Sequence, residues 1–459
     1  MDTIAAIATA IGSCGIGVIR ISGPDAFLIG DRLFESVSGT PSTFHSHTVH
    51  YGSMVHPVNR ELIDKVLLTV FRAPASYTGE DTIEISCHGG VVTLGRALEA
   101  AYDAGAQPAG PGEFTKRAFL NGRLDLAQAE AVNDIIRART DDAQRQALNQ
   151  LGGMLSSNVS KITDTILSIL ARIEASIDFP EDVEEPNYQL LAGEINMLVQ
   201  NIDHLIATSD RGRIYREGIS LAIIGRPNVG KSSLLNALLR QSRAIVTPVP
   251  GTTRDVIEES INIRGIPVIA ADTAGLRAAA DEVERIGVEL TERTMAAAGL
   301  ILFVVDSSYG LTDEDRKILS GFETPVLIVL NKIDLLTNEN KLEALQQIHS
   351  EFPYIVAIPI SASTGLGIEE LEDKIAETVM SGKAGSGEGA LVTNLRHKQA
   401  LIAAKESLEK ALITIEQALP IDFLSIDLAA ARMNLGDITG DTASADLVDR
   451  IFQDFCIGK

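Results

Sequence analysis

The sequence predicts a multidomain chain of combined α/β and α class: an N-terminal α+β domain, a discontinuous helical-bundle domain, and a three-layer α/β domain inserted into that bundle. Strand and helix patterns alternate between about residues 217 and 380, and long helical patterns stand on both sides of this stretch. The length of 459 residues suits about three domains. The expected boundaries are 1–120, 121–216, 217–380 and 381–459.

The first 120 residues carry short strand patterns and one helix. Strands are expected at Thr3–Ala8, Gly17–Gly23, Thr48–Met54, Lys65–Arg72 and Thr82–Cys87. A helix is expected over Val91–Asp103. Asp81, Glu84 and His88 are residue types that ligate metals or act as a general base. They also suit the solvated edge of a strand, which their spacing favours, and this stretch carries no nucleotide-binding fingerprint.

From Leu148 onward, apolar residues recur at three- and four-residue steps, as on a helix with one buried face. The stripe consists of Leu148, Leu151, Leu155, Val159, Ile162, Ile166, Ile169, Ile173 and Ile177. Gly152-Gly153 predicts a kink or break in it, and the acidic segment Pro180–Pro186 ends it. Later helical patterns lie over Leu191–Leu205, Lys398–Leu419, Asp427–Leu435 and Ala443–Phe455. The Gly-rich stretch Gly382–Gly389 is expected to be a flexible linker.

The inserted stretch contains Gly225–Ser232, which reads GRPNVGKS. It follows the apolar run Ile219–Ile224 and opens a helical pattern at Ser233–Leu239. A strand, a Gly-rich turn, Lys-Ser and a helix are the parts of a phosphate-binding loop, because backbone N–H groups and the helix N-terminus then face the phosphates. Lys231 is expected to reach the β- and γ-phosphates, and the Ser232 hydroxyl to ligate Mg²⁺.

Three more motifs follow expected strands of this insertion: Asp272–Gly275, Asn331–Asp334 and Ser361–Ser363. The strands are expected at Val256–Ile263, Pro267–Ala271, Leu300–Val305, Pro325–Leu330 and Tyr354–Ile360. In the first motif, the carboxylate suits the Mg²⁺ shell and the glycine amide suits sensing of the γ-phosphate. The aspartate that closes the second accepts two N–H groups of guanine, a pair that adenine lacks. Together the motifs predict a Ras-like P-loop GTPase domain.

The segment Gly251–Asp255 stands where a switch loop belongs, and Thr252 or Thr253 would complete the Mg²⁺ shell in the GTP state. Asn228, inside the phosphate-binding loop, suits a monovalent cation beside the phosphates. Such a cation would supply the charge of an arginine finger.

Many small GTPases place a glutamine directly after the motif that ends at Gly275, but here the residue is Leu276, which cannot orient water. Water must therefore be positioned by another group. The acidic cluster Asp281–Glu284 lies a few residues further on. The same cluster also suits the N-terminus of a helix, where acidic side chains complement the dipole.

The composition limits the classes of function. A formal net charge of −23 argues against a nonspecific nucleic-acid coat. The sequence has no long apolar run, so a membrane span is not expected. It has no basic N-terminal region, so a signal peptide is not expected either. Cys14, Cys87 and Cys456 are far apart without metal-ligand spacing, which fits a reduced cytoplasm.

The chain closely resembles the MnmE (TrmE) family, the bacterial and organellar tRNA-modification GTPases, over essentially its whole length. Outside the GTPase motifs, the resemblance rests on Gly17–Gly23, Tyr77–Asp81, His88–Gly90, Pro111–Leu126 and Phe455–Lys459. It implies a cytoplasmic homodimer joined through N-terminal domains that bind 5-formyl- or 5,10-methylene-tetrahydrofolate. It also implies a flavoprotein partner, MnmG (GidA), in a heterotetramer or larger complex that supplies FAD and NADH chemistry. Together they would add a carboxymethylaminomethyl or aminomethyl group at C5 of the wobble uridine of certain tRNAs.

The resemblance also assigns roles to residues by motif position. Arg20, Glu84, Arg123 and Lys459 would line the folate site, with Cys456 a possible one-carbon site. Position 123 is Arg where several relatives carry Lys. Mg²⁺ would be held by Ser232 and Thr253, and K⁺ by Asn228, Thr247, Val249 and Thr252. Glu284, with Gly251 and Thr252, would serve hydrolysis, Glu284 orienting the attacking water through a bridging water. K⁺ would let the two G domains of the dimer meet and hydrolyse GTP.

The full set of expected GTP-binding residues is Asn228, Val229, Gly230, Lys231, Ser232, Ser233, Thr247, Thr252, Thr253, Asp272, Thr273, Ala274, Gly275, Asn331, Lys332, Asp334, Ser361, Ala362 and Ser363. Two other functions use the same switch chemistry. A ribosome-assembly GTPase would need a basic RNA-binding domain, against which the acidic helical half argues. A regulatory GTPase that relies on activating proteins would hydrolyse GTP slowly with or without K⁺.

Overall fold

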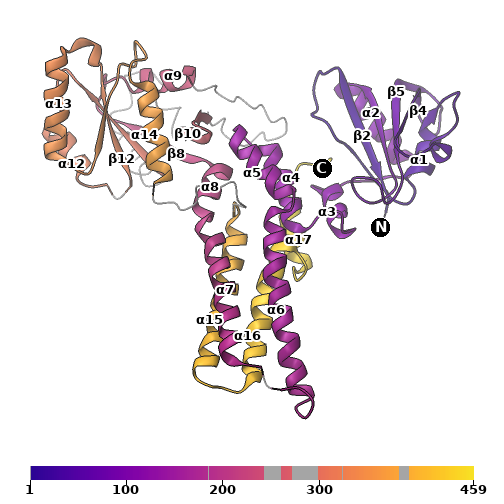
Figure 1. Cartoon of the computed structure of the whole chain (residues 1–459). Coiled ribbons are helices and arrows are strands. Elements are labelled where there is room, and N and C mark those ends of the chain that lie inside the picture. The colour runs from indigo at the N-terminus through magenta and orange to yellow at the C-terminus, as the bar shows by residue number, and fades with distance from the viewer. Residues whose placement is uncertain (1, 185, 242–259, 271–297, 323, 382–391) are drawn as a thin grey trace.

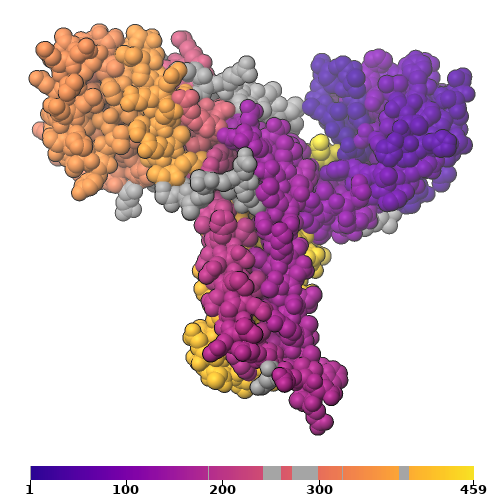
Figure 2. Space-filling view, in the orientation of Figure 1, coloured from indigo at the N-terminus to yellow at the C-terminus, as the bar shows by residue number. Residues whose placement is uncertain are grey.

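Two α/β parts stand at one end of a long helical stalk (Figure 1). The computed structural model describes residues 2–184, 186–241, 260–270, 298–322, 324–381 and 392–459. The C-terminus returns to the N-terminal part, and in the space-filling view its yellow atoms lie beside the N-terminal domain (Figure 2). Among the described helices, none combines the length and apolar character needed to cross a membrane.

The N-terminal part is a seven-stranded sheet in the order β3-β4-β5-β6-β2-β1-β7. Its strands are β1 Ile4–Ile7, β2 Ile16–Ser22, β3 Phe34–Glu35, β4 Thr48–Val55, β5 Leu62–Phe71, β6 Thr82–His88 and β7 Gln107–Pro108. One face packs on α1 (Ala26–Leu33) and α2 (Val91–Asp103) over a core that includes Ile19, Leu68 and Ile85. The five predicted strands and the predicted helix of this part are confirmed, with shifts at their ends.

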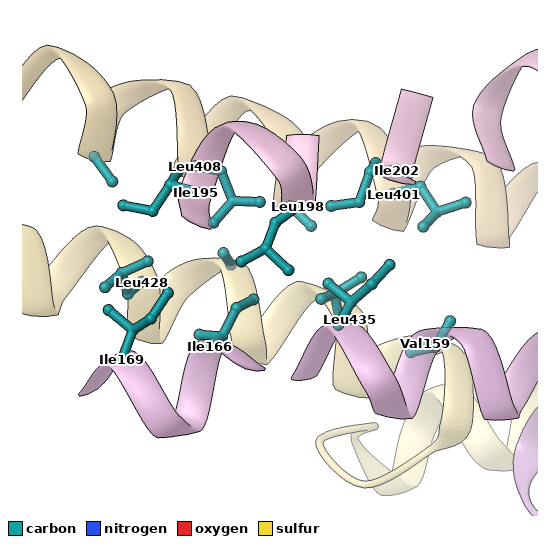
Figure 3. Close-up of a cluster of buried hydrophobic side chains, with 14 of the residues drawn as sticks. Val159, Ile166, Ile169, Ile195, Leu198, Ile202, Leu401, Leu408, Leu428 and Leu435 are labelled. Atoms are coloured by element: carbon teal, nitrogen blue, oxygen red, sulfur yellow. The ribbon is translucent and has the colours of Figure 1, made fainter. Parts of the chain in front are cut away.

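The stalk joins helices from both sides of the inserted domain. Before the insertion come α3 Glu113–Leu120, α4 Leu126–Arg137, α5 Asp141–Leu151, α6 Met154–Asp178, α7 Tyr188–Ala207 and α8 Ser209–Glu217. After it come α15 Leu395–Glu416, α16 Ile421–Thr439 and α17 Ala445–Gln453. Side chains of α6, α7, α15 and α16 form one apolar core (Figure 3). Each buried Leu or Ile stabilises this core by about 1.5–3 kcal/mol.

The predicted break at Gly152-Gly153 is confirmed, because α5 ends at Leu151 and α6 begins at Met154. Gly153 has φ 80°, a left-handed conformation that glycine adopts without strain. The stripe from Leu155 to Ile173 is buried as predicted, but Leu148 and Ile177 are exposed. Leu148 belongs to the separate helix α5, and Ile177 lies at the last turn of α6, so neither faces the shared core.

The inserted part is a six-stranded sheet in the order β13-β12-β11-β8-β10-β9. The strands are β8 Ile219–Ile224, β9 Ser260–Ile263, β10 Ile266–Ala270, β11 Leu300–Asp306, β12 Val326–Asn331 and β13 Val356–Pro359. All pairs are parallel except β9 with β10. Within the described residues of this part, the helices are α9 Lys231–Gln241, α12 Asp313–Leu319, α13 Asn338–Glu351 and α14 Ile368–Met380, with a 3-10 turn η2 at Ile333–Leu335. This arrangement confirms the predicted α/β sheet with phosphate loop between β8 and α9.

A buried ionic cluster lies where the inserted domain rejoins the stalk. Glu130 of α4 accepts hydrogen bonds from the Arg396 guanidinium at 2.7 Å and from His397 Nε2 at 2.6 Å. Burial raises the pKa of Glu130, but the charges and hydrogen bonds of His397 and Arg396 outweigh burial and lower that pKa to about 2.

This low pKa predicts acid sensitivity. Because the folded-state pKa lies below the ordinary 4.5, ionised Glu130 stabilises the fold above that ordinary value, by about 3 kcal/mol. The contribution is lost as the pH falls from about 4.5 towards 2. Urea unfolding at several pH values should therefore show a steeper acid loss for the wild type than for Glu130→Gln. Glu194→Gln, at an exposed pair on the stalk, is the control. Parallel acid profiles of the wild type and Glu130→Gln would contradict the assignment.

Candidate functional site

The phosphate-binding loop connects β8 to α9 and depends on two glycines. A Cβ on Gly225 would lie 2.3 Å from the Val304 carbonyl oxygen of β11, and a Cβ on Gly230 would lie 2.2 Å from Asn331 Nδ2. Both glycines have positive φ, as does Asn228 at 62°. A side chain at either glycine position would clash, so the loop can fold tightly against β11 and β12 only with glycine at both positions.

Lys231 begins α9 and folds back over the loop. Its Nζ donates to the carbonyl oxygens of Gly225 at 2.6 Å and Arg226 at 2.9 Å. Burial lowers the pKa of Lys231. The ammonium is therefore held at the mouth of the loop, where it would meet bound phosphates. Ser232 and Ser233 follow it on the first turn of α9, and both are exposed.

Asn331 joins three of the predicted motifs. The side chain is buried, its Nδ2 donates to the Val229 carbonyl at 2.8 Å, and its Oδ1 accepts from the Ala362 amide at 3.0 Å. Asn331 ends β12, Ala362 follows β13, and Val229 belongs to the phosphate loop. The base-binding motifs and the phosphate loop therefore form one connected unit.

Lys332 makes a second link from the base-binding motif to the phosphate loop. Its Nζ donates to the Asn228 carbonyl at 2.9 Å and to Asp306 Oδ2 at 2.7 Å. Burial raises the pKa of Asp306, but hydrogen bonds from Lys332 and Ser308 outweigh burial and lower that pKa. Sequence reasoning missed Asp306, although a carboxylate directly after the predicted strand Leu300–Val305 was a signal that could have found it.

The remaining base-binding residues lie at the same edge of the sheet. Asp334 lies exposed in η2, with its carboxylate accessible to a guanine edge. Ser361 is buried, its amide donates to the Leu366 carbonyl at 2.9 Å, and its Oγ lies 3.0 Å from Ser363 Oγ. Ala362 lies between them and is held by Asn331. This loop follows β13, as the parallel topology requires.

Ten predicted site residues lie outside the described part of the chain. They are Thr247, Val249, Gly251, Thr252, Thr253, Asp272, Thr273, Ala274, Gly275 and Glu284. The switch loop, most of the expected K⁺ ligands, the Thr253 ligand of Mg²⁺ and the proposed water-orienting glutamate therefore stay predictions.

A second polar site lies on the N-terminal sheet. Arg20 of β2 stands opposite Glu84 of β6, and its Nε donates to Glu84 Oε1 at 2.8 Å. The Arg20 guanidinium lies 5.5 Å from the ring centres of both Tyr77 and Phe114. No role for either aromatic residue was evident from the sequence, because Tyr77 in a loop and Phe114 at the start of α3 meet Arg20 only through the tertiary fold.

The C-terminal residues dock onto this sheet. Phe114 N donates to the Lys459 carbonyl at 3.1 Å, Gly112 N donates to the Cys456 carbonyl at 3.2 Å, and Arg20 Nη1 donates to the Gly458 carbonyl at 3.5 Å. Gly458 has φ 94°, and a Cβ there would lie 2.2 Å from the Ile7 carbonyl oxygen. Residues more than 400 positions apart thus share one site, and only glycine permits this approach.

The other predicted residues of this site lie at its rim. Arg123 is exposed, and the Cβ position of Gly79 lies 3.4 Å from Arg123 Cγ, so its stem packs on the loop that also holds Tyr77. The Cys456 thiol is free and exposed. Lys459 is half-buried at the end of the chain.

The residues considered for a metal in the N-terminal domain take separate partners. Asp81 accepts from the Ala73 amide at 2.9 Å, Glu84 pairs with Arg20, and His88 Nδ1 lies 2.8 Å from Asp64 Oδ1. Within the described residues, no group of three or more His, Cys, Asp or Glu side chains is placed to hold a metal ion. The three side chains therefore make separate contacts at or directly before β6, which is an interior strand of the sheet between β5 and β2.

A hollow of about 630 Å³ lies along α3 and α17, bordered by Gln107, Lys116, Arg117, Asp449 and Phe452. Neither Arg20 nor Glu84 lines it, so this hollow is separate from the polar site on the sheet. The Lys116–Asp449 ion pair, 2.6 Å long, spans the two helices beside it.

Comparison with known proteins identifies the family of the chain. A model of the TrmE N-terminus, described as a GTP-binding protein, matches residues 3–123, and a model of the MnmE helical domain matches residues 126–456. The tRNA modification GTPase MnmE of Desulforamulus reducens is 49% identical over 100% of this chain and 99% of that protein. The proteins of the same name from Moorella thermoacetica and Bacillus subtilis are 48% and 46% identical, over 100% of this chain and 99% and 100% of theirs. The chain is therefore a GTP hydrolase that belongs to the MnmE family of tRNA modification GTPases.

Proposed function

We propose that this GTPase uses a tetrahydrofolate one-carbon unit, with the flavoprotein MnmG, to modify C5 of the wobble uridine of certain tRNAs in the cytoplasm. GTP hydrolysis, assisted by Mg²⁺ and K⁺, drives the pairing of G domains in a homodimer and the accompanying conformational change. The observation that carries this proposal is the docking of the C-terminal residues onto the sheet at Arg20, in a chain that also contains a GTPase domain.

The Arg20 site suits a folate by its chemistry. A pterin has a flat face that packs on aromatic rings and an edge of N–H donors that a carboxylate accepts. Tyr77 and Phe114 offer the rings, and Glu84 offers the carboxylate. Arg123 and Lys459 would meet the anionic or carbonyl groups of the remainder of the molecule. Cys456 stands beside this site as the possible one-carbon residue.

The homodimer is supported by the sheet face that carries this site. Tyr51 and Leu67, paired across β4 and β5, are 66% and 47% exposed. Leu67 and Thr69 point to the same face, and Thr69 pairs with Glu84, which pairs with Arg20. The apolar residues and the polar site therefore share the face opposite α1 and α2. An isologous contact between two such faces would bury both.

The proposed function is tested by a modification assay. The wild type is mixed with MnmG, GTP, a tetrahydrofolate and either glycine or ammonium, and the wobble nucleoside of the tRNA is analysed by mass spectrometry. We expect the C5 substituent to form only with the complete mixture. Arg20→Ala should abolish it while GTP turnover stays at the wild-type rate, because Arg20 belongs to the N-terminal sheet. Unchanged tRNA in the complete mixture would refute the proposal.

Potassium dependence tests the proposed hydrolysis mechanism. GTP turnover is measured in KCl and NaCl at matched ionic strength over a range of protein concentration. We expect turnover to be at least about tenfold faster in KCl and to rise with protein concentration, since a bound cation replaces an arginine finger at paired G domains. Asn228→Ala should remove the difference between the salts. Equal, slow rates in both salts would instead indicate a regulatory GTPase that needs an external activator.

A further inference from the structure

Two acidic residues of α4, one helical turn apart, hold the two connections between the stalk and the G domain. Asp134 accepts from Arg216 Nε at 2.8 Å. Arg216 lies in the last turn of α8, which leads directly into β8. Glu130 accepts from Asn394, Arg396 and His397. These three residues begin α15, where the chain returns from the G domain.

The segment that leads into the G domain, α8, also contacts the segment that returns from it. Val392 N donates to Thr208 Oγ1 at 3.1 Å, and a Cβ on Gly212 of α8 would lie 2.3 Å from the Val392 carbonyl oxygen. Thr393 Oγ1 donates to Gln150 Oε1 at 2.9 Å, and Gln150 Nε2 donates to the Ala127 carbonyl of α4 at 2.8 Å. A rotation of the G domain that displaces either of these segments would therefore move or break bonds to α4.

Arg396 extends this cluster to a third segment. Besides Glu130, its guanidinium donates to the Asp437 and Ile438 carbonyls in the last turn of α16. The end of α16 packs on the start of α4, since a Cβ on Gly440 would lie 2.7 Å from the Phe119 ring and 2.9 Å from Leu126 Cβ. From there the chain continues through α17 to the residues docked at Arg20.

The N-terminal end of α4 is also connected to the site at Arg20. Asp125 caps α4 by accepting from Gln128 N at 2.8 Å, and Arg123 stands two residues before it. Thus α4 has one end beside the Arg20 site, while its middle holds both G-domain connections.

We propose that α4 and Arg396 transmit the position of the G domain to the folate site: Glu130 and Asp134 hold the two connections, and Arg396 positions the end of α16. This inference rests on the proposed function for the identity of the site at Arg20. Its physical basis is that Glu130, Arg396 and His397 are buried or nearly so. Buried charges tolerate few arrangements, because a charge left without its partner costs several kcal/mol. The cluster is therefore expected to switch between discrete arrangements. Each arrangement would couple one position of the G domain to one arrangement of the site at Arg20.

Hydrogen exchange in the full chain tests this coupling without requiring folate. Backbone exchange is measured by mass spectrometry with GDP and with a non-hydrolysable GTP analogue, in the presence of Mg²⁺ and K⁺. In the wild type, we expect amides of 112–124 and 455–458 to change their exchange rates between the two states by at least about fivefold. Asp134→Asn and Arg396→Lys should reduce that change to less than about twofold.

The substitutions are conservative, so that an effect on coupling can be separated from an effect on folding. Arg396→Lys retains the positive charge but loses the planar fork that joins Glu130 to α16. The matched control is Arg172→Lys, at an Arg–Glu pair between α6 and α7 on the stalk. It should leave the nucleotide-dependent change intact. Thermal unfolding of every variant in both states verifies that the domains remain folded.

Each outcome decides the proposal. The proposal would be overturned by no change in the wild type at 112–124 and 455–458, by a change of wild-type size in both Asp134→Asn and Arg396→Lys, or by an equal loss in Arg172→Lys. Loss in Asp134→Asn and Arg396→Lys alone would support it. Binding of 5-formyl-tetrahydrofolate to the wild type is measured in parallel. Absence of that binding would refute the folate part of the proposed function, while the exchange result would still decide whether α4 carries the coupling.

Discussion

Asn331→Ala is expected to weaken guanine-nucleotide binding by about 30- to 1,000-fold. The substitution removes two buried hydrogen bonds and leaves the Val229 carbonyl and the Ala362 amide without their partner. Taking about 1–2 kcal/mol for each such buried group, the lower and middle part of the usual range, a total of about 2–4 kcal/mol follows. The loss would fall on the nucleotide-binding arrangement, because those bonds hold the phosphate loop against the loop after β13.

Fluorescent GDP and GTP analogues measure this effect directly, with affinities from equilibrium titration. Asn340→Ala, at an exposed position near the start of α13, is the control and should bind like the wild type. Thermal unfolding without nucleotide separates a loss of binding from a loss of folding. An affinity for GDP within about threefold of wild type would show that Asn331 does not organise the site.

Gly458→Ala is expected to release the C-terminal residues from the N-terminal sheet. A Cβ at this position would lie 2.2 Å from the Ile7 carbonyl oxygen, and alanine is strained at φ 94°. Misplacement of a substrate-positioning group by about 1 Å can cost about 100-fold in rate. We therefore expect tRNA modification to fall by at least about 100-fold. GTP turnover should stay unchanged, since no hydrogen bond or ion pair joins this segment to the described residues of the G domain.

Limited proteolysis from the C-terminus reports the release, and the nucleoside assay reports the activity. The control is Gly193→Ala, where an exposed helical glycine has open space for a Cβ. That substitution should stabilise α7 slightly, because alanine favours helix over glycine. Protease resistance equal to wild type in Gly458→Ala, together with full modification activity, would show that the tail tolerates a side chain there.

The G domain was predictable because its chemistry is local in sequence. The phosphate loop needs a strand, glycines at tight turns and a helix within a short stretch, and parallel strands bring Asn331 and Ser361 to the same edge. Asp306 was missed because its role arises from the approach of Lys332, 26 residues away. That approach is set by the pairing of β11 with β12.

The stalk illustrates a partial success. The apolar period of α6 predicted which residues from Leu155 to Ile173 face the core, since a helix repeats its face every three to four residues. The period alone could not show that Leu148 belongs to a different helix or that Ile177 lies beyond the shared core. It also could not identify α15 and α16 as the helices packed against α6 and α7.

By itself, the sequence determined the class of each domain, the GTPase motifs and the family resemblance, because helical and strand periods and loop motifs are local properties of the chain. The contacts of Arg20 with Glu84, Phe114 and Gly458, and of Glu130 with Arg396 and His397, became visible in the folded molecule alone. These contacts join residues tens to hundreds of positions apart. Their energy depends on burial and on distances of a few ångströms, which arise only when separate elements pack together.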